Sequence, residues 1–484
     1  MNRKTLQKGC VAVLLGYWLL AILFHWIAGA QLYFRDEKTE MMAMNAMIGE
    51  LTAGAELRQP FRADADELFS VSLPLTTYGR TNTAHLSIVL EDVEGTRLGE
   101  IVLDEAMLED GETAETYFPE PVTLRKGERY TLVLSSPDGA PGNACTVWYG
   151  TGISAARTEI QKNIPAEDCL LVNGQVLNGM LCFQLGVRTH LWFGDAYWYL
   201  AGICWLVLLV YALHLLRAEN AGKSTAVLRL LSAIQRYQFL IRQLISRDFK
   251  TKYKRSVLGI LWSFLNPLLM MSVQYLVFST IFKSNIYNFA LYLLTGIVCF
   301  NFFSEATSMS LVSIVGNASL ITKVYVPKYI YPVTRVLSSG VNLLLSIVPL
   351  FGFMLLTGTP FRPALLLLPF GVLCLLMLCT GMGLLLSTSM VFFRDTQFLW
   401  NVVSMLWMYL TPIFYPVSII PEQWMTLYKC NPLYHIIRFF RILIIDGVSP
   451  EPKAYLLCFL ASAVPLAIGV LVFRRNQDKF ILNL

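Results

Sequence analysis

Long apolar segments separated by short polar connections make up most of this chain. Each segment has about 20 residues or more, which at ~1.5 Å per helical residue covers the ~30 Å hydrocarbon core of a bilayer. The pattern predicts an α-helical polytopic membrane protein with about eight transmembrane helices. The predicted spans are residues 10–30, 196–216, 257–282, 289–314, 333–356, 364–391, 398–419 and 454–473.

A segment with a different pattern lies between the first two predicted spans. Short runs rich in β-branched and aromatic residues alternate there with turns such as Pro137-Asp138-Gly139 and Asn173-Gly174. Regularly spaced short strands are typical of an antiparallel β-sandwich, and we expect one of jelly-roll type. The predicted strands are residues 69–75, 85–90, 130–134, 146–149 and 181–187.

These patterns divide the chain into five parts. They are an N-terminal transmembrane anchor, a β-sandwich domain, a second transmembrane helix, a basic segment with an amphipathic helix, and a six-span core. The boundaries are 1–30, 31–192, 193–217, 218–256 and 257–484. Because Ala28-Gly29-Ala30 resembles a signal-peptidase site, a cleaved signal peptide is the alternative for the first part. We favour an anchor, since the apolar run exceeds the usual ~7–15 residues.

Composition and charge support a membrane location and an orientation. Hydrophobic residues make up 55% of the chain, charged residues 15%, and the mean hydropathy is +0.54. The net charge of +5 comes from Lys and Arg beside the apolar segments, which indicates an orientation signal rather than nucleic-acid binding. The basic segment 218–256 is therefore predicted to be cytoplasmic, both termini with it, and the β domain extracytoplasmic.

The end of the basic segment has the pattern of an amphipathic helix. Apolar or aromatic side chains recur every fourth residue, which places them on one helix face. They are Tyr237, Ile241, Ile245, Phe249 and Tyr253. Cations occupy the other faces, so we expect this helix to lie on the membrane surface. It is predicted to continue without a break into the span that begins at Val257, with Pro267 permitting a kink.

The sequence offers little sign of catalysis or of a bound cofactor. Gly222-Lys223-Ser224-Thr225 lacks the earlier glycine of a phosphate-binding loop, so we predict no nucleotide site in this chain. The ten cysteines show no metal-ligand spacing. At most one pair among Cys145, Cys169 and Cys182 can form a disulfide within the β domain.

Two ionisable residues lie in or near predicted spans. Glu305 falls within the span 289–314, where a carboxylate is costly and is a functional candidate by default. Arg335, near the cytoplasmic end of the next span, is a possible partner for it. Glu305 could instead face a pore, pair across a dimer interface, or be neutral and hydrogen-bonded to a neighbouring helix.

Four blocks of the C-terminal half resemble a known family. They are RDFKTKYKRSVLGILWSFLNP at 247–267, LITKVYVPKYIYPVTRV at 320–336, VFFRDTQFLWNVVSMLWMYLTPIFYP at 391–416 and NPLYHIIRFFR at 431–441. In order and spacing they are similar to permease subunits of type-2 ATP-binding-cassette exporters, nearest to those for O-antigen and teichoic-acid polysaccharides. The resemblance covers about residues 240–484, and the N-terminal anchor, β domain and return span depart from it.

The resemblance implies a bacterial cytoplasmic-membrane location and a complex of two permeases with two separate ATPase subunits. The ATPases bind ATP and Mg²⁺, so no cofactor and no enzymatic activity are expected in this chain. The implied substrate is a glycan on a polyprenyl-pyrophosphate lipid. Arg and Lys suit that anion. The candidates for the gate helix and the lipid pyrophosphate are Arg247, Lys250, Lys254, Arg255 and Trp262.

Two further groups of residues are carried over from the resemblance. Residues that match the segments coupled to the ATPase are Lys323, Val324, Tyr325, Pro327, Lys328, Phe393, Arg394 and Asp395. Residues that match an outer re-entrant region are Pro412, Tyr415, Pro416, Asn431 and Pro432. For the gate-helix cations Arg247, Lys250, Lys254 and Arg255, headgroup anchoring and orientation signalling are the alternative, which would require the same residues.

Three aromatic residues of the β domain, Tyr78, Trp148 and Tyr149, are candidates for glycan binding, although sandwiches also use aromatics as core. The expected function is export of a lipid-linked polysaccharide or teichoic-acid-like polymer. Alternatives are an exporter of another lipid or glycolipid, and a membrane-anchored glycan receptor. A membrane-embedded transferase would need an acid or base, for which the candidates are Glu305, Asp395 and Asp446.

Overall fold

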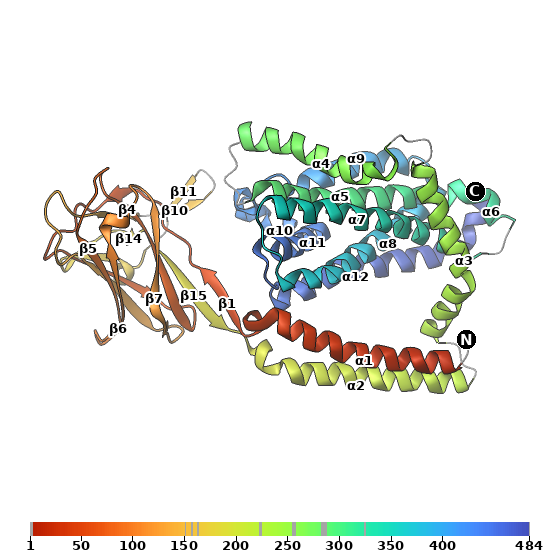
Figure 1. Ribbon diagram of the computed structural model, residues 1–484, viewed down its shortest axis with the longest axis horizontal. Coiled ribbons are helices and arrows are strands. Elements are labelled where there is room, and N and C mark those ends of the chain that lie inside the picture. Colours follow the sequence, from red (N-terminus) through yellow and green to blue (C-terminus); the bar gives the residue numbers. More distant parts are fainter. Residues whose placement is uncertain are drawn as a thin grey trace. The chain divides into compact units, whose positions relative to one another are not determined.

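The chain folds into two compact units, which are described separately (Figure 1). One unit comprises Met1–Gln31 and Ala196–Leu484, and the other comprises Leu32–Asp195. The structure is a computed structural model. It describes all residues except 1–2, 151, 156–157, 162–163, 222–224, 254–257, 282–287, 324–325 and 484.

The unit Leu32–Asp195 consists of two antiparallel sheets around one apolar core. One sheet has the order β1-β15-β4-β9-β14, with β2 paired to β9 and β7 to β4. Its strands are β1 Phe34–Lys38, β2 Ala46–Met47, β4 Glu67–Thr76, β7 Thr113–Thr123, β9 Thr146–Gly150, β14 Met180–Leu181 and β15 Gln184–His190. The other has the order β13-β12-β3-β8-β5-β6, with β3 Glu56–Arg62, β5 His85–Glu91, β6 Arg97–Asp104, β8 Arg129–Ser135, β12 Leu170–Val172 and β13 Gln175–Leu177. β10 Gly152–Ala155 and β11 Thr158–Gln161 form a separate hairpin.

Strands appear at four of the five predicted positions, and the fifth is divided. The predicted strand 181–187 is interrupted, because β14 ends at Leu181 and β15 begins at Gln184. Several strands were not predicted, and β7 shows why. It contains Pro119 and Pro121 together with Glu115 and Glu120, and in the described structure it pairs only with β4. Proline is tolerated in such an edge strand, since one side needs no ladder hydrogen bonds.

Cysteines in this unit are thiols. Cys145, Cys169 and Cys182 are buried and none of them forms a disulfide. Burial raises the pKa of the Cys182 thiol to about 12, so it stays protonated at neutral pH.

Six described helical stretches of the other unit are long and apolar enough to cross a membrane. They contain α1 Arg3–Ala28, α2 Trp192–Asn220, α5 Phe289–Leu311, α7 Ile330–Leu356, α8 Leu368–Phe392 and α12 Pro452–Asn476. The predicted spans 257–282 and 398–419 correspond to shorter helices, α4 Trp262–Tyr275 and α9 Thr396–Leu410. A π-helical segment, Leu276–Ile281, follows α4 directly.

The amphipathic helix is α3, Ala226–Tyr253. The prediction that it continues unbroken into the next span is wrong. A 3-10 turn at Gly259–Leu261 precedes α4, and Gly259 has a φ of +49°. A left-handed conformation favours glycine and ends a helix, so α3 and α4 are separate elements. Residues 254–257 lie outside the described part of the chain.

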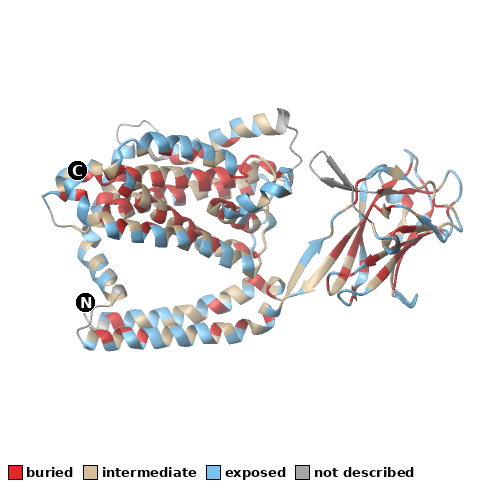
Figure 2. Ribbon diagram, turned by 180° about the vertical axis from the view of Figure 1, so that it is seen from behind, coloured by how far each residue is buried: buried red, intermediate tan, exposed pale blue. Residues whose placement is uncertain are grey.

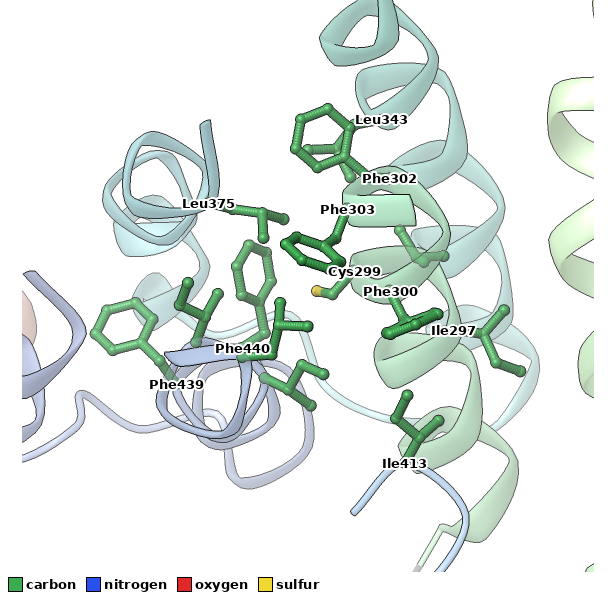
Figure 3. Packing of buried hydrophobic residues seen from close by; sticks show 14 of the residues in the cluster. Ile297, Cys299, Phe300, Phe302, Phe303, Leu343, Leu375, Ile413, Phe439 and Phe440 are labelled. Carbon is green, nitrogen blue, oxygen red and sulfur yellow. The ribbon is translucent and has the colours of Figure 1, made fainter. Parts of the chain in front are cut away.

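Helix α5 is the centre of the membrane unit. Seventy-two per cent of its most apolar window is buried, against 6% in α1. Figure 2 shows this contrast between the core helices and the largely exposed pair α1 and α2. Phe303 and Cys299 of α5 point toward Leu375 of α8 and Phe440 of α11, Pro432–Arg441 (Figure 3). The close-packed core makes α5 a rigid reference for the helices around it.

Glycines bring α8 and α12 into backbone contact. A Cβ atom on Gly469 of α12 would lie 2.2 Å from the carbonyl oxygen of Gly381 on α8. A Cβ atom on Gly381 would lie 2.5 Å from backbone atoms of Pro465 and Leu466. Small residues permit such close helix packing in membranes, where van der Waals contact replaces the hydrophobic driving force.

A buried arginine closes the break after α9. The chain is irregular from Thr411 to Pro421 before α10, Glu422–Cys430. Arg441, at the end of α11, donates to the carbonyls of Pro412 at 2.7 Å and Ile413 at 3.1 Å. Its guanidinium carbon lies 3.3 Å from the ring centroid of Tyr292 on α5. Arg441 thus satisfies backbone groups that the break leaves without helical partners, as irregular backbone in a membrane protein requires.

We expect Gly469→Ala to destabilise the membrane unit, because the added methyl must push α12 away from α8. The cost of such overpacking is about 1–3 kcal/mol. Thermal unfolding in detergent would show a lower midpoint. Gly352→Ala is the control, since no atom lies within 4 Å of a Cβ at that helical position. Equal midpoints for both variants would contradict the close contact.

Arg441→Met should destabilise the outer part of the same unit. The variant removes the hydrogen bond to the Ile413 carbonyl. Leaving a buried polar group without a partner costs about 1–3 kcal/mol of stability. Limited proteolysis of residues 411–430 in detergent would report the loosening. Arg438→Met, an exposed position on the same helix, is the matched control. If both variants resist protease equally, Arg441 does not hold the break together.

Candidate functional site

Three helices contribute to a polar cluster at the end of α3. Lys252 donates from Nζ to both carboxylate oxygens of Glu305, each at 2.9 Å. Asn342 donates from Nδ2 to Oε1 of Glu305 at 2.7 Å. Lys252 belongs to α3, Glu305 to the last third of α5, and Asn342 to α7. The cluster therefore joins the amphipathic helix to two core helices, across whose ends α3 runs (Figure 1).

A second ion pair joins α3 to α7. Asp248 accepts from Arg335 NH1 at 2.7 Å and from Arg247 NH2 at 3.3 Å. The Asp248 side chain is 4% exposed, so this carboxylate depends on its partners. The predicted pairing of Glu305 with Arg335 is wrong. Arg335 lies roughly two turns, about 10 Å, nearer the start of α7 than Asn342, which is the residue that reaches Glu305.

Two cavities flank the first cluster. The larger, about 600 Å³, is lined by residues of both clusters together with Phe249, Thr251, Met309, Gly316, Asn317 and Ser338. The smaller, about 170 Å³, is lined by residues of α4, α5 and α7, with Trp262, Asn266, Asn301, Ser339 and Ser346 among them. Lys252, Glu305 and Asn342 line both cavities. These three side chains thus form the wall between a charged cavity and a polar, mostly uncharged one.

The structure separates the predicted gate-helix residues. Arg247 lines the larger cavity and Trp262 the smaller one, whereas Lys250 is exposed on α3 and lines neither. Lys254 and Arg255 lie outside the described residues.

Lys252, Asp248 and Asn342 were not predicted. A signal was present, because Lys252 follows Asp248 by four residues and so shares its helix face. Asn342 is an amide within an otherwise apolar segment, which is also a functional signal. Their partners could not be read from the sequence, since they come from other helices.

The segment between α5 and α7 contains two lysines, Lys323 and Lys328, which differ in their exposure and contacts. A short helix, α6 Ala318–Ile321, precedes Lys323, which lies in a turn and is exposed. Pro327 is half-buried, and Val324 and Tyr325 lie outside the described residues. Lys328 donates to the carbonyl of Gln477 at 2.5 Å and lies 5.8 Å from the Phe480 ring centroid. The C-terminal tail therefore holds Lys328.

The same tail supports the start of α7. Phe480 is fully buried against Ile321, Tyr331 and Phe473. Its ring centroid lies 5.2 Å from that of Phe473 and 6.1 Å from that of Phe392 at the end of α8. The segment 318–329 thus rests on a small apolar core of its own before it leads into α7.

The α8–α9 loop presents its three residues to the outside. Phe393, Arg394 and Asp395 are exposed, and the Phe393 side chain is 71% accessible. The carboxylates considered for a transferase lie apart in the fold. Asp395 is in this loop, Glu305 is in the polar cluster, and Asp446 ends the π-helical segment Ile442–Asp446.

The predicted outer residues form one hydrogen-bonded region. Tyr292 donates to the carbonyl of Tyr415 at 2.9 Å and to that of Pro412 at 3.3 Å. Asn431 accepts from Trp407 Nε1, donates to Thr411, and caps α11 through the amide of Leu433. Pro432 is the first residue of α11, and Pro416 precedes a 3-10 turn. Cap and proline together explain the sharp restart of the helix.

Of the three candidate aromatics in the β unit, Tyr78 is presented most openly. It is 43% exposed, has a φ of +57°, and lies under the guanidinium of Arg80 at 5.1 Å. Arg80 is held by Glu50 at 2.5 Å, a contact that also lowers the pKa of Glu50. Trp148 is half-buried and donates to Thr76, and Tyr149 packs against the β core. A bulky residue in the left-handed region is strained, and such strain concentrates at functional positions.

The residues that line the two cavities lie in the part of the chain that matches a known protein family. Residues 239–445, which include both clusters, match the model of the ABC-2 type transporter family. The chain is 30% identical over 244 residues to an O-antigen export system permease protein RfbA from Klebsiella pneumoniae, covering 50% of this chain and 93% of that protein.

Two other relatives cover the same half of the chain. An RfbA permease from Myxococcus xanthus is 28% identical over 260 residues, with 52% of this chain and 98% of that protein covered. The polysialic acid transport protein KpsM from Escherichia coli is 23% identical over 248 residues, with 50% and 95% covered. The chain therefore belongs to the ABC-2 type transporter membrane family and is a multi-pass protein of the cytoplasmic membrane.

Proposed function

We propose that this chain is the permease subunit of an exporter that moves a lipid-linked cell-surface polysaccharide across the cytoplasmic membrane. A separate ATPase subunit would bind ATP and Mg²⁺ and supply the energy. The names of the relatives support the substrate class. The observation that carries the proposal is the charged cavity beside α3, because it combines cations for an anionic lipid headgroup with a wall formed by the ion pair of Lys252 and Glu305.

We also propose the full topology of eight spans with both termini in the cytoplasm. α4 with its π-helical continuation covers Trp262–Ile281, which at roughly 1.5 Å per residue approaches the ~30 Å of the hydrocarbon core. Lys and Arg cluster in α3 and at the end of α12, as the positive-inside rule requires for cytoplasmic segments. The β unit, proposed to be of jelly-roll type, would then be extracytoplasmic.

A second copy of the chain fits the exposed polar groups of the spans. Asn266 of α4, Asn301 of α5 and Asn401 of α9 are exposed in this single chain. An amide facing lipid at membrane depth is costly, so such a face favours contact with a partner or with water. We therefore place the α4, α5 and α9 side of the unit at the interface of a homodimer and along the export path.

We propose that the ATPase acts on the cavity through α7. The segment that contains Lys323 leads straight into α7, and α7 carries Arg335 and Asn342. These two residues hold α3 through Asp248 and Glu305. A displacement of the start of α7 by the ATPase would strain both contacts together and release α3, which would open the cavity toward the export path.

Affinity purification of the chain in mild detergent should recover an ATPase subunit in stoichiometric amount. Phe393→Ala combined with Lys323→Ala should reduce the recovered ATPase about tenfold or more, because an exposed aromatic of this kind is a typical binding hot spot. Arg229→Ala, an exposed cation elsewhere on α3, is the control. If no ATPase is recovered from the unmodified chain, a membrane-anchored glycan receptor becomes the better description. Co-purification of a different lipid would indicate another glycolipid exporter.

For the β unit we propose glycan binding at Tyr78, whose ring Arg80 covers on one side. The full chain in nanodiscs should bind the surface polysaccharide purified from cells that produce it. Tyr78→Ala should weaken this binding about three- to tenfold, the size expected for one stacked ring. Tyr117→Ala, exposed on β7, should leave it unchanged. No binding at millimolar glycan, or equal binding by both variants, would contradict a site at Tyr78.

A further inference from the structure

An ion pair between Lys252 and Glu305 separates the two cavities and is accessible from the larger one. The side chains of Lys252 and Glu305 are 41% and 30% exposed. Those of Asp248 and Arg335 are 4% and 22% exposed. The Asp248 pair is therefore desolvated and holds α3 on α7, whereas the Lys252 pair is solvated and adds little stability. Of the two contacts, the one with Lys252 is the more readily exchanged.

The larger cavity carries an excess of positive charge. Three cations line it, Arg247, Lys252 and Arg335, against the carboxylates of Asp248 and Glu305. Arg247 and Arg335 both contact Asp248. Lys252 is the cation that contacts Glu305 among the described residues lining the cavity. A phosphate dianion presents more charge and more acceptor oxygens to Lys252 than one carboxylate does, and charge-assisted bonds to phosphate are strong.

Glu305 can lose Lys252 without becoming an unpartnered buried carboxylate. Its Oε1 accepts from Asn342 at 2.7 Å, a bond independent of α3. Asn342 also lines the smaller cavity, together with Asn266, Asn301 and Trp262. Loss of the lysine contact would thus free the end of α3 from α5 and join a charged compartment to one suited to neutral hydroxyl groups.

We propose that Lys252 and Glu305 form an anion-exchange latch. A phosphate or diphosphate headgroup that enters the larger cavity takes Lys252 from Glu305, Glu305 stays on Asn342, and α3 separates from α5. Without such an anion, Glu305 stays paired with Lys252 and the two cavities remain separate. A neutral glycolipid cannot make this exchange, so the latch selects the anionic class. The assignment of the anion to a lipid-linked substrate rests on the proposed function.

The latch predicts opposite effects for its two residues. Glu305→Gln removes the competing charge and keeps an acceptor for Asn342, so phosphate should bind about two- to fivefold more tightly, the range set by one exposed ion pair. Lys252→Ala should weaken binding, and Lys252→Arg should restore it. Arg242→Ala, at an exposed position of α3 outside both cavities, is the control. A pair that only supported the fold would weaken binding in both variants.

The test uses the full chain in nanodiscs with three probes. Binding of polyprenyl diphosphate, soluble inorganic pyrophosphate and phosphatidylglycerol would each be titrated. Tight binding of the first alone indicates a lipid-linked source, and equal binding of the first two indicates recognition of free phosphate. Thermal unfolding of each variant would confirm that the fold is intact.

Two results would overturn the latch. One is a folded Glu305→Gln variant whose affinity for every phosphate probe equals or falls below that of the unmodified chain. The other is a Lys252→Ala variant that binds as the unmodified chain does. Either result leaves the proposed function standing if the unmodified chain still recovers its ATPase and exports polysaccharide. Failure of that recovery and export would instead overturn the proposed function.

Discussion

The cost of burying charge governs the arrangement of the helical unit. Asp248 and Arg441 are buried, and Glu305 lies on the apolar helix α5, so each of these charges needs polar partners. Each is matched by groups from another part of the chain: Glu305 by Lys252 and Asn342, Asp248 by Arg335, and Arg441 by carbonyls of the break after α9. These partners lie on other segments of the chain. The charges are therefore neutralised or hydrogen-bonded only when those segments are correctly placed.

This requirement gives the unit a rigid part and a displaceable part. α5 lies within close-packed aromatic and aliphatic side chains, and α8 meets α12 along glycine contacts that allow little movement. α3 makes ion pairs at one end, to α7 and to α5. The segment 318–329 leads into α7, and α7 carries Arg335 and Asn342, which contact Asp248 and Glu305.

The β unit has an apolar core of its own, separate from that of the helices. Its two sheets enclose their own cluster of buried residues, so its stability does not require the packing of the helices. Tyr78 is displayed on a loop whose conformation is held by Arg80, Glu50 and neighbouring backbone groups. An aromatic face held in this way loses little freedom when it meets a ligand, which favours recognition of a flexible glycan.

The sequence by itself determined the helical membrane class, a separate β segment, the amphipathic helix and the family, because apolar run length, period and ordered motifs are local properties. It placed Arg247 and Glu305 near the site but paired Glu305 with Arg335. It also joined α3 to α4, which the left-handed Gly259 separates. Only the tertiary structure decided that Lys252 and Asn342 meet Glu305, that the C-terminal tail binds Lys328, and that Tyr78 is the most exposed of the three candidate aromatics. These outcomes depend on how helices cross and strands pair over long separations, and side-chain periodicity within one element carries no information about which residue of another element it will face.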